Sequence, residues 1–281
     1  MKIIKTIHEM QWVAEQSRLA RKRIGFVPTM GFLHEGHLSL LDLSRQNSDL
    51  TVMSIFVNPT QFAPNEDFDA YPRDFVQDET LAKERGCDIL FYPNEHEIYS
   101  DPYRTYVSVK QITELMCGAS RPVYFRGVTT IVAKLFNIVK PHFAVFGQKD
   151  AQQCFVIKQM VRDLNFDIEI IIGPIIREED GLAMSSRNIY LSASERKDAL
   201  ILNQCLNRAR ELIESGERGA VMIKSTLEKM IESVSSAKID YIEIVETTQL
   251  KPVAILQGEI LIAIAVWIGK TRLIDNLMIT L

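Results

Sequence analysis

Within residues 1–175, short apolar runs alternate with segments whose apolar residues recur at helical spacing. The runs 143–146 and 170–172 are apolar at every position, as in strands that are buried on both faces. Strands that alternate with helices in this way form a parallel sheet, so the pattern predicts an α/β fold. We predict strands at residues 23–28, 50–57, 88–92, 142–146 and 167–172, and helices at residues 7–21, 36–46, 74–85, 126–139 and 150–164.

The alternation stops at a Gly-Pro pair, residues 173–174, and a polar stretch follows at residues 177–181. We place a domain boundary there, which predicts one domain over residues 1–175 and a second over residues 176–281. A capping box that starts at Ser192 predicts a helix from about Ala193 to about Glu214. A helix at residues 220–234 and strands at 238–246 and 259–269 complete a smaller α+β domain.

The composition excludes several classes of protein. The 281 residues carry a net charge of -4, which gives no general attraction to nucleic acid or to acidic membranes. The longest apolar run, residues 260–268, is shorter than the ~20 residues that cross a bilayer, and the N-terminus has no secretory pattern. The four cysteines form no Cys-x-x-Cys pair, which argues against a zinc ribbon or a redox motif. We expect a soluble, reduced, cytoplasmic protein.

One decapeptide, Pro28 to His37, places His34 and His37 three residues apart with Gly36 between them. A glycine-rich turn that leaves a strand and enters a helix lets backbone N–H groups approach a phosphate. A histidine there can donate a hydrogen bond to a phosphate oxygen, so the turn is a candidate ATP site. The alternative is that both histidines make only local hydrogen bonds. Zinc is disfavoured, because the spacing is not His-Glu-x-x-His and no third ligand is evident.

Two further segments carry groups suited to phosphate. Lys149 and Asp150 follow the strand predicted at residues 142–146, and ligands of open α/β sheets bind beyond the carboxyl ends of strands. Lys149 supplies a mobile positive charge, whereas Asp150 equally fits a helix N-cap. Ser185, Ser186 and Arg187 can grip a triphosphate through charge-assisted hydrogen bonds. Their place at the start of the second domain predicts a hinged flap over the cleft.

Amide side chains near the same edge suit a substrate with hydroxyl and carboxylate groups, because an amide both donates and accepts hydrogen bonds. Asn58 and Gln61 follow a predicted strand, and Gln153 lies one turn into the helix after Lys149. The alternative is that they are ordinary surface amides. Three carboxylates are candidates for a metal, although we expect solvated loop and helix positions for them: Asp67, Asp69 and Asp78.

Together these motifs are recognisable. Residues 34–37 resemble the HxGH element, and residues 184–187 the KMSKS-type loop, of the adenylate-forming nucleotidyltransferases. More narrowly, the chain resembles the pantothenate synthetase (pantoate–β-alanine ligase) family over essentially its whole length. The matching segments are residues 28–31, 56–59, 61–62, 71–73, 125–128, 147–150, 152–153 and 185–188.

The resemblance implies an enzyme that joins (R)-pantoate to β-alanine through a pantoyl adenylate and splits ATP, with Mg²⁺, to AMP and diphosphate. It implies a Rossmann-like parallel sheet with helices on both faces, a smaller C-terminal lid domain and a homodimer. By resemblance, His37 is the proton donor, and the other catalytic residues are His34, Lys149, Ser185, Ser186 and Arg187. Further ATP contacts fall on Met30, Gly31, Gly147, Asp150, Ile176 and Met184, and pantoate or β-alanine contacts on Asn58, Gln61 and Gln153.

Two positions depart from the family pattern. The family usually has a histidine before the Phe-Arg-Gly-Val segment, where this chain has Tyr124, whose hydroxyl can keep one hydrogen bond. Phe32 stands where a small residue is common.

Three other functions fit parts of the pattern. Nucleotide transfer onto a phosphorylated precursor uses the same histidine turn, but it needs a phosphate pocket in place of two contacts to carboxylate substrates. An RNA-binding module of the tRNA synthetase type is disfavoured by the acidic balance. A non-catalytic ATP sensor is disfavoured because His37, Lys149 and Arg187 are all intact.

Overall fold

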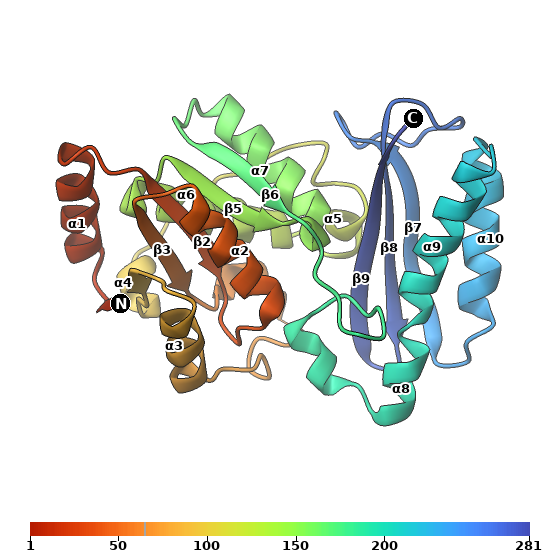
Figure 1. Cartoon of the computed structure of the whole chain (residues 1–281), viewed down its shortest axis with the longest axis horizontal. Helices are drawn as coiled ribbons and strands as arrows, with labels where there is room; N and C mark the ends of the chain where they lie inside the picture. The colour runs from red at the N-terminus through yellow and green to blue at the C-terminus, as the bar shows by residue number, and fades with distance from the viewer. Residues whose placement is uncertain (65) are drawn as a thin grey trace.

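The fold contains two β-sheets of different design (Figure 1). The computed structural model describes residues 1–64 and 66–281, in which a six-stranded parallel sheet precedes a three-stranded antiparallel sheet along the chain. The parallel strands lie in the order β1-β4-β3-β2-β5-β6. Their bounds are β1 Lys2–Ile4, β2 Ile24–Thr29, β3 Leu50–Ile55, β4 Ile89–Phe91, β5 Phe143–Gly147 and β6 Glu169–Gly173. The α/β fold class is therefore confirmed.

All five strands predicted in this part of the chain are confirmed, with ends shifted by one or two residues. The prediction missed β1, which pairs in parallel with β4 from Lys2 to Ile4. A strand of three residues leaves too short a run for a periodic signal, and the edge of an existing sheet decides its pairing.

Both faces of the parallel sheet are covered by helices. In β2, Phe26 packs among side chains of α1, α6 and α7, whereas its neighbour Val27 packs against α2. In β5, Ala144 and Val145 divide between the two faces in the same way. The helices predicted here are confirmed as α1 Ile7–Leu19, α2 Glu35–Gln46, α3 Phe75–Glu84, α6 Tyr124–Val139 and α7 Ala151–Asp163, and the short helices α4 Glu95–Ile98 and α5 Cys117–Ser120 are additional.

The winding of the chain reverses between β2 and β5. After β2 the chain builds β3 and β4 on one side, and it then returns to form β5 and β6 on the other. Gly25 and Phe26 pair in parallel with Phe143 and Ala144, so the two strands end at the same edge. Such a switch point leaves a crevice beyond the carboxyl ends of the strands. The turns after β2 and β5 therefore meet there.

The C-terminal part is an antiparallel sheet backed by helices. The helix predicted from Ala193 is split at residues 199–200, where the Leu200 N–H donates to the Lys197 carbonyl in a tighter turn. The capping box is present, because the Glu195 N–H donates to Ser192 Oγ. The bounds are α8 Ala193–Asp198, α9 Ile201–Glu214, α10 Ala220–Glu232, β7 Ala237–Glu246, β8 Glu259–Ile268 and β9 Thr271–Thr280.

Strand β9 is absent from the sequence prediction. It carries Arg272, Asp275 and Asn276 among its apolar residues, and these interrupt the alternation that marks a half-buried strand. In the fold, Asp275 and Asn276 are nevertheless buried, at 2% and 4% exposure. The strand forms because it pairs with β8 along its whole length.

The antiparallel sheet is a middle layer between α9 and α10 and the parallel-sheet part of the chain (Figure 1). Ile262 and Ile264 of β8 pack among the apolar side chains of α9 and α10. Leu261 and Ala263 face the other way and pack with Met116 and with Ala151 at the start of α7. The two parts thus share an apolar contact. The boundary between two domains at residues 175 and 176 stays a proposal.

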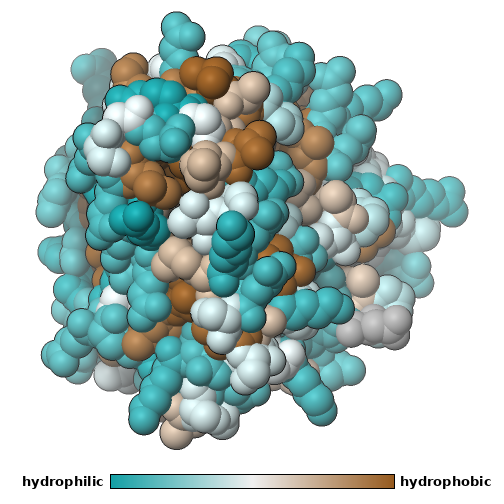
Figure 2. Space-filling view, turned by 90° about the vertical axis from the view of Figure 1, so that its right-hand side faces the viewer, coloured by the Kyte–Doolittle hydropathy of each residue, from teal (hydrophilic) through white to brown (hydrophobic). Residues whose placement is uncertain are grey.

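Figure 2 looks onto the side of the molecule that α9 and α10 form, which is mostly hydrophilic with scattered apolar patches. On α10, Val221 and Met222 are exposed apolar side chains. In residues 1–64 and 66–281, no helix is both long enough and apolar enough to cross a membrane.

Gly127 of α6 lies against the turn η1 (Pro59–Gln61), and a Cβ there would be 2.4 Å from the Thr60 oxygen and 2.6 Å from Gln61 Cα. We expect Gly127→Ala to lower the free energy of unfolding by about 1–3 kcal/mol, because overpacking against backbone outweighs the roughly 1 kcal/mol gain in helix propensity. Urea denaturation measures the change. A midpoint equal to or above that of the unaltered chain would contradict this assignment.

Candidate active site

A cleft of about 210 Å³ lies beyond the carboxyl ends of β2 and β5. Almost every residue that the sequence singled out lines it, although these residues come from five separate segments. The lining residues include Met30, His34, His37, Asn58, Gln61, Gly147, Lys149, Asp150, Gln153, Ile176, Met184, Ser185, Ser186 and Arg187. Gly31, the remaining expected ATP contact, is not among the residues that line the cleft.

The histidine turn connects β2 to α2 and is held by its own side chains. His34 is the N-cap of α2, and its Nδ1 accepts the Gly36 N–H at 3.1 Å. The Nδ1 atom of His37 accepts the His34 N–H at 3.4 Å. A neutral imidazole whose Nδ1 accepts carries its proton on Nε2. The local hydrogen bonds considered as an alternative are therefore present, but they leave both Nε2–H groups as donors for the cleft.

Both imidazoles are neutral in this structure. Burial lowers the pKa of His34 to about 4, and the positive charge of Lys149 acts in the same direction. Burial also lowers the pKa of His37 well below its usual range, with smaller effects from His34 and Lys149. The two rings lie with their centroids 4.0 Å apart. They can therefore act as paired neutral hydrogen-bond donors to one anionic ligand.

Asp78 fixes the start of this turn. Its carboxylate accepts the N–H groups of Phe32 and Leu33 at 2.8 and 2.6 Å, and the side chain is buried. Gly31 and Phe32 have φ angles of 83° and 51°, so both use the left-handed region, which a glycine adopts most easily. The expectation that Asp78 is a solvated helix carboxylate is wrong, because the side chain is buried, and burial raises the pKa of its carboxyl even though it accepts two backbone N–H groups.

The second turn runs from Gly147 through η2 (Gln148–Asp150) into α7. Lys149 forms no ion pair with any carboxylate of residues 1–64 and 66–281. Asp150 occupies the N-cap position of α7, but its side chain makes no capping hydrogen bond. The capping alternative for Asp150 therefore explains its backbone position and leaves its carboxylate for another partner.

The third segment lies against the first. Ser186 Oγ donates to the Phe32 carbonyl at 3.3 Å, and Ser185 Oγ accepts the Arg187 N–H. Arg187 makes a bidentate pair with Asp67, at 2.9 and 3.0 Å. Burial opposes ionisation of Asp67, but this pair outweighs it and holds the pKa of the carboxyl below its usual range. The expectation of a solvated carboxylate is thus wrong for Asp67 as well.

Asn58 and Gln61 form a buried amide pair. Asn58 Nδ2 donates to Gln61 Oε1 and to the Gly127 carbonyl, both at 3.1 Å. Its Oδ1 accepts from the hydroxyls of Thr60 and Tyr99. Because both donors and both lone pairs of Asn58 are used, the substrate contact expected for it does not fit. Asn58 instead orients Gln61, whose Nε2 points toward Met30 Sδ.

Tyr124 is placed to orient the second amide. Its hydroxyl lies 3.3 Å from Gln153 Oε1, and its ring lies under the guanidinium of Arg121. Burial raises the pKa of Tyr124, so the phenol stays neutral. Donation from Tyr124 to Oε1 leaves Gln153 Nε2–H₂ for the cleft. The departure from the family histidine thus retains one hydrogen bond, as expected, and supplies no charge.

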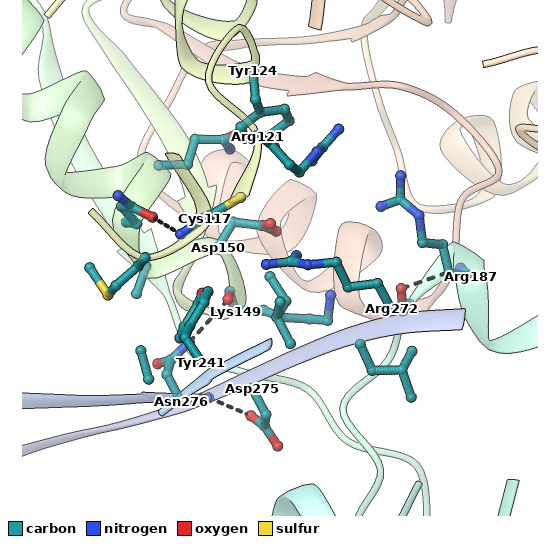
Figure 3. Close-up of a pocket in the computed structure, with 18 of the residues that line it drawn as sticks. Cys117, Arg121, Tyr124, Lys149, Asp150, Arg187, Tyr241, Arg272, Asp275 and Asn276 are labelled. Atoms are coloured by element: carbon teal, nitrogen blue, oxygen red, sulfur yellow. Dashed lines mark hydrogen bonds between the residues drawn. The ribbon is translucent and has the colours of Figure 1, made fainter. Parts of the chain in front are cut away.

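A second, smaller cavity of about 70 Å³ adjoins the first, between α5, η2 and the antiparallel sheet (Figure 3). Figure 3 shows Arg121, Arg187 and Arg272 around the space beside Lys149 and Asp150. Each arginine has a carboxylate partner, Glu66, Asp67 and Asp240 respectively. Lys149 therefore remains the cation most available to a ligand.

Comparison with known proteins agrees with this geometry. The profile of the family described as "Pantoate-beta-alanine ligase" matches residues 2–278. The chain belongs to the pantoate–β-alanine ligase family.

Relatives and solved structures of this family match the chain from end to end. A pantothenate synthetase of Acetivibrio thermocellus is 57% identical over 279 residues, and one of Caldicellulosiruptor bescii is 56% identical over 279 residues, each with 99% of both chains covered. The crystal structure of pantothenate synthetase from Thermus thermophilus has a TM-score of 0.94 at 42% identity, with 99% of each chain covered. A pantoate–β-alanine ligase from Francisella tularensis, complexed with β,γ-ATP and β-alanine, has a TM-score of 0.79 at 35% identity, with 99% of this chain and 97% of that chain covered.

Sequence reasoning missed the apolar wall of the cleft. Four residues of one face of α6 line the cleft, namely Val128, Ile131, Val132 and Leu135. Their spacing was visible in the sequence as part of an amphipathic helix, which is also the pattern of an ordinary core helix. Only the position of α6 under the switch point distinguishes a cleft wall from a core contact.

The carboxylates, histidines and cysteines of the described residues are the side chains that a metal site or a reactive thiol would use. Within residues 1–64 and 66–281, no group of three or more His, Cys, Asp or Glu residues is placed to hold a metal ion. The four cysteines are free thiols. Burial raises the pKa of Cys87 and of Cys205 to about 12, and it also raises the pKa of Cys117 and Cys154. None of the four is therefore a thiolate near neutral pH.

The lowered pKa of His34 has a consequence for stability. The unfolded chain, with a histidine pKa of about 6.5, binds more protons than the folded chain between that value and about 4. Stability therefore falls as the pH is lowered through this window. Between about pH 7 and about pH 5, we expect the unaltered chain to lose on the order of 1–2 kcal/mol more than His34→Gln. Urea titrations at both pH values measure this, and equal losses would contradict it.

Proposed function

We propose that this chain condenses (R)-pantoate with β-alanine to give pantothenate, and splits ATP to AMP and diphosphate through a pantoyl adenylate. The observation that carries the proposal is the meeting of three donor segments and two oriented amides around one cleft. The donor segments suit a triphosphate, and the amides suit a small hydroxy acid. The family of the chain, and the ATP and β-alanine present in the Francisella tularensis relative, support the same reaction.

The reaction needs two displacements and no enzyme nucleophile. In the first, a carboxylate oxygen of pantoate attacks the α-phosphorus of ATP, and the bond to diphosphate breaks. In the second, the amine of β-alanine attacks the acyl carbon, the bond to AMP breaks and the nitrogen loses a proton. The protein must position two anions and stabilise the charge that builds on the phosphates.

The phosphate donors of this proposal come from all three segments. His34 and His37 donate through Nε2–H, Lys149 supplies the mobile positive charge, and Ser185, Ser186 and Arg187 close the third side. Because Asp67 holds Arg187 in the free protein, the triphosphate replaces or shares that partner. Met30, Gly31, Gly147, Asp150, Ile176 and Met184 are proposed to contact the rest of ATP.

The amides act on the other substrates. Gln61 is proposed to contact both pantoate and β-alanine, and Gln153 to hold pantoate through its free Nε2–H₂. The wall from Val128 to Leu135 excludes water beside the methyl groups of pantoate.

Mg²⁺ fits the cleft as a companion of the triphosphate. Mg²⁺ takes oxygen ligands and is commonly held by one or two carboxylates together with substrate phosphates. The carboxylate of Asp150 lines the cleft and makes no hydrogen bond within residues 1–64 and 66–281. Asp150 would therefore hold the ion, which would neutralise phosphate charge. From the resemblance we also propose a homodimer, a cytoplasmic location and a lid role for residues 176–281.

His37→Ala and Lys149→Ala are each expected to slow pantoate-dependent ATP–diphosphate exchange by roughly 100- to 1,000-fold, because each removes one preorganised phosphate donor. Isotope exchange measures adenylate formation, and a melting curve checks the fold. Lys158→Ala is the matched control, since Lys158 is an exposed lysine of α7 that does not line the cleft. Near-normal exchange in either site variant would exclude the assigned role.

Gln61→Ala is expected to lower kcat/KM for pantoate by about 10- to 100-fold, because the substrate loses a hydrogen-bond partner in a buried site. The Kd for ATP should stay nearly constant. Steady-state kinetics with ATP, pantoate and β-alanine each omitted in turn provide the comparison. Release of diphosphate at the full rate with neither AMP release nor a requirement for β-alanine would favour a different nucleotidyltransferase, because such an enzyme keeps the AMP group on its product.

A further inference from the structure

Two adjacent residues of β9, Asp275 and Asn276, make polar contacts with segments that lie far away in the sequence. Strand β9 is one of the two edge strands of the antiparallel sheet and is far from the histidine turn in the sequence. Buried polar side chains in a strand are costly unless each finds partners. Both residues are buried, and both find their partners in segments that carry phosphate-binding candidates.

Asn276 holds the Lys149 turn. Its Nδ2 donates to the carbonyl of Gln148 at 2.9 Å and to the carbonyl of Lys149 at 3.0 Å. Its Oδ1 accepts from Gln148 Nε2 at 3.2 Å. One amide thus ties η2 to the antiparallel sheet through both of its donors. Because these hydrogen bonds are made to backbone carbonyls, they fix the position of the Lys149 backbone. The ammonium group of Lys149 is not used in them.

Asp275 holds the segment that leads to Ser185. Its carboxylate makes a bidentate pair with Arg177, at 2.6 and 3.0 Å, and its side chain is only 1% exposed. Arg177 in turn donates to the Gly181 carbonyl and forms an antiparallel bridge with Ala183. The next residue, Met184, opens the third donor segment. Asp275 therefore acts through a short hairpin on residues 184–187.

The alternation of side chains along β9 explains how the adjacent residues Asp275 and Asn276 can hold two different segments. Successive side chains of a strand point to opposite faces. In Figure 3, Asp275 and Asn276 leave β9 in opposite directions. Leu273 and Leu277, which share a face with Asp275, pack toward α9 and α10, while Met278, which shares a face with Asn276, packs toward the parallel-sheet part.

We propose that Asp275 and Asn276 are positioning residues that hold the Lys149 turn and the Met184–Arg187 segment at the separation that a triphosphate requires. This role rests on the proposed function, since it assigns phosphate donors to both segments. A misplacement of about 1 Å can cost as much as 10²-fold in rate. The amides proposed to bind pantoate are Gln61 and Gln153, and in the described part of the chain neither forms a hydrogen bond to β9.

The test uses two variants that keep the side-chain shape. Asn276→Asp removes the amide donors, and Asp275→Asn removes the negative charge. Ser120→Ala is the matched control, because Ser120 joins α5 to Asp240 of β7 across the same contact between the two parts. Two readouts are needed. They are ATP–diphosphate exchange in the presence of pantoate, and amide hydrogen exchange of the ATP-free protein in peptides covering residues 147–151 and 182–188.

We expect kcat/KM for ATP to fall by about 10- to 100-fold in both variants, while KM for pantoate changes by less than about 2-fold. Hydrogen exchange should accelerate in residues 147–151 for Asn276→Asp and in residues 182–188 for Asp275→Asn. Ser120→Ala should alter neither readout. If Asn276→Asp fails to fold, Gln148→Ala removes one bond of the same contact and is expected to give the same local acceleration.

Three results would overturn the proposal. One is hydrogen exchange in the two variants equal to that of the unaltered protein. Another is a loss of catalysis in Ser120→Ala as large as theirs, which would indicate general docking of the two parts. The third is faster local exchange with unchanged kinetics. If the unaltered protein shows no pantoate-dependent activity, the proposed function fails, and hydrogen exchange still decides whether β9 holds the two segments.

Discussion

The site depends on one topological constraint, which is that β2 and β5 are parallel neighbours with opposite winding on either side of them. Parallel strands end at the same edge, so the turns that follow them must meet even though they are more than a hundred residues apart in the sequence. The histidine turn and the Lys149 turn become one surface for this reason. Gln61 follows β3 and Gln153 lies in the first turn of α7, so the same sheet edge also places these two amides beside that surface.

Burial sets the chemistry of this surface. Desolvation keeps His34 and His37 neutral, while backbone N–H groups occupy their Nδ1 atoms and so direct the remaining proton of each ring to Nε2. Burial also raises the pKa of the Asp78 carboxyl, although that carboxyl accepts two backbone N–H groups. In the described part of the chain, Lys149 differs from the arginines around it, since each of those already has a carboxylate partner. The cleft therefore combines neutral donors with one available positive charge.

The two parts of the chain meet through both apolar and polar contacts. An apolar layer that includes Leu261, Ala263 and Met116 packs the antiparallel sheet against α5 and α7. Polar contacts at its rim run from β9 to segments that line the cleft. Apolar burial supplies attraction without direction, whereas these hydrogen bonds define which atoms lie opposite one another. A lid that closes over the cleft would have to preserve or exchange these bonds.

The sequence by itself determined the strands, helices and motifs that depend on short-range patterns. The apolar runs predicted the parallel strands, the capping box at Ser192 predicted the start of α8, and the spacing around His34 and Lys149 indicated phosphate chemistry. Only the tertiary structure decided the parts played by Asp78, Asn58 and Asp275, because each is explained by partners far away in the chain. Strand β9 escaped the sequence pattern for the same reason. Its polar residues contradict the local signal of a buried strand, and they are stable there only because distant segments complete their hydrogen bonds.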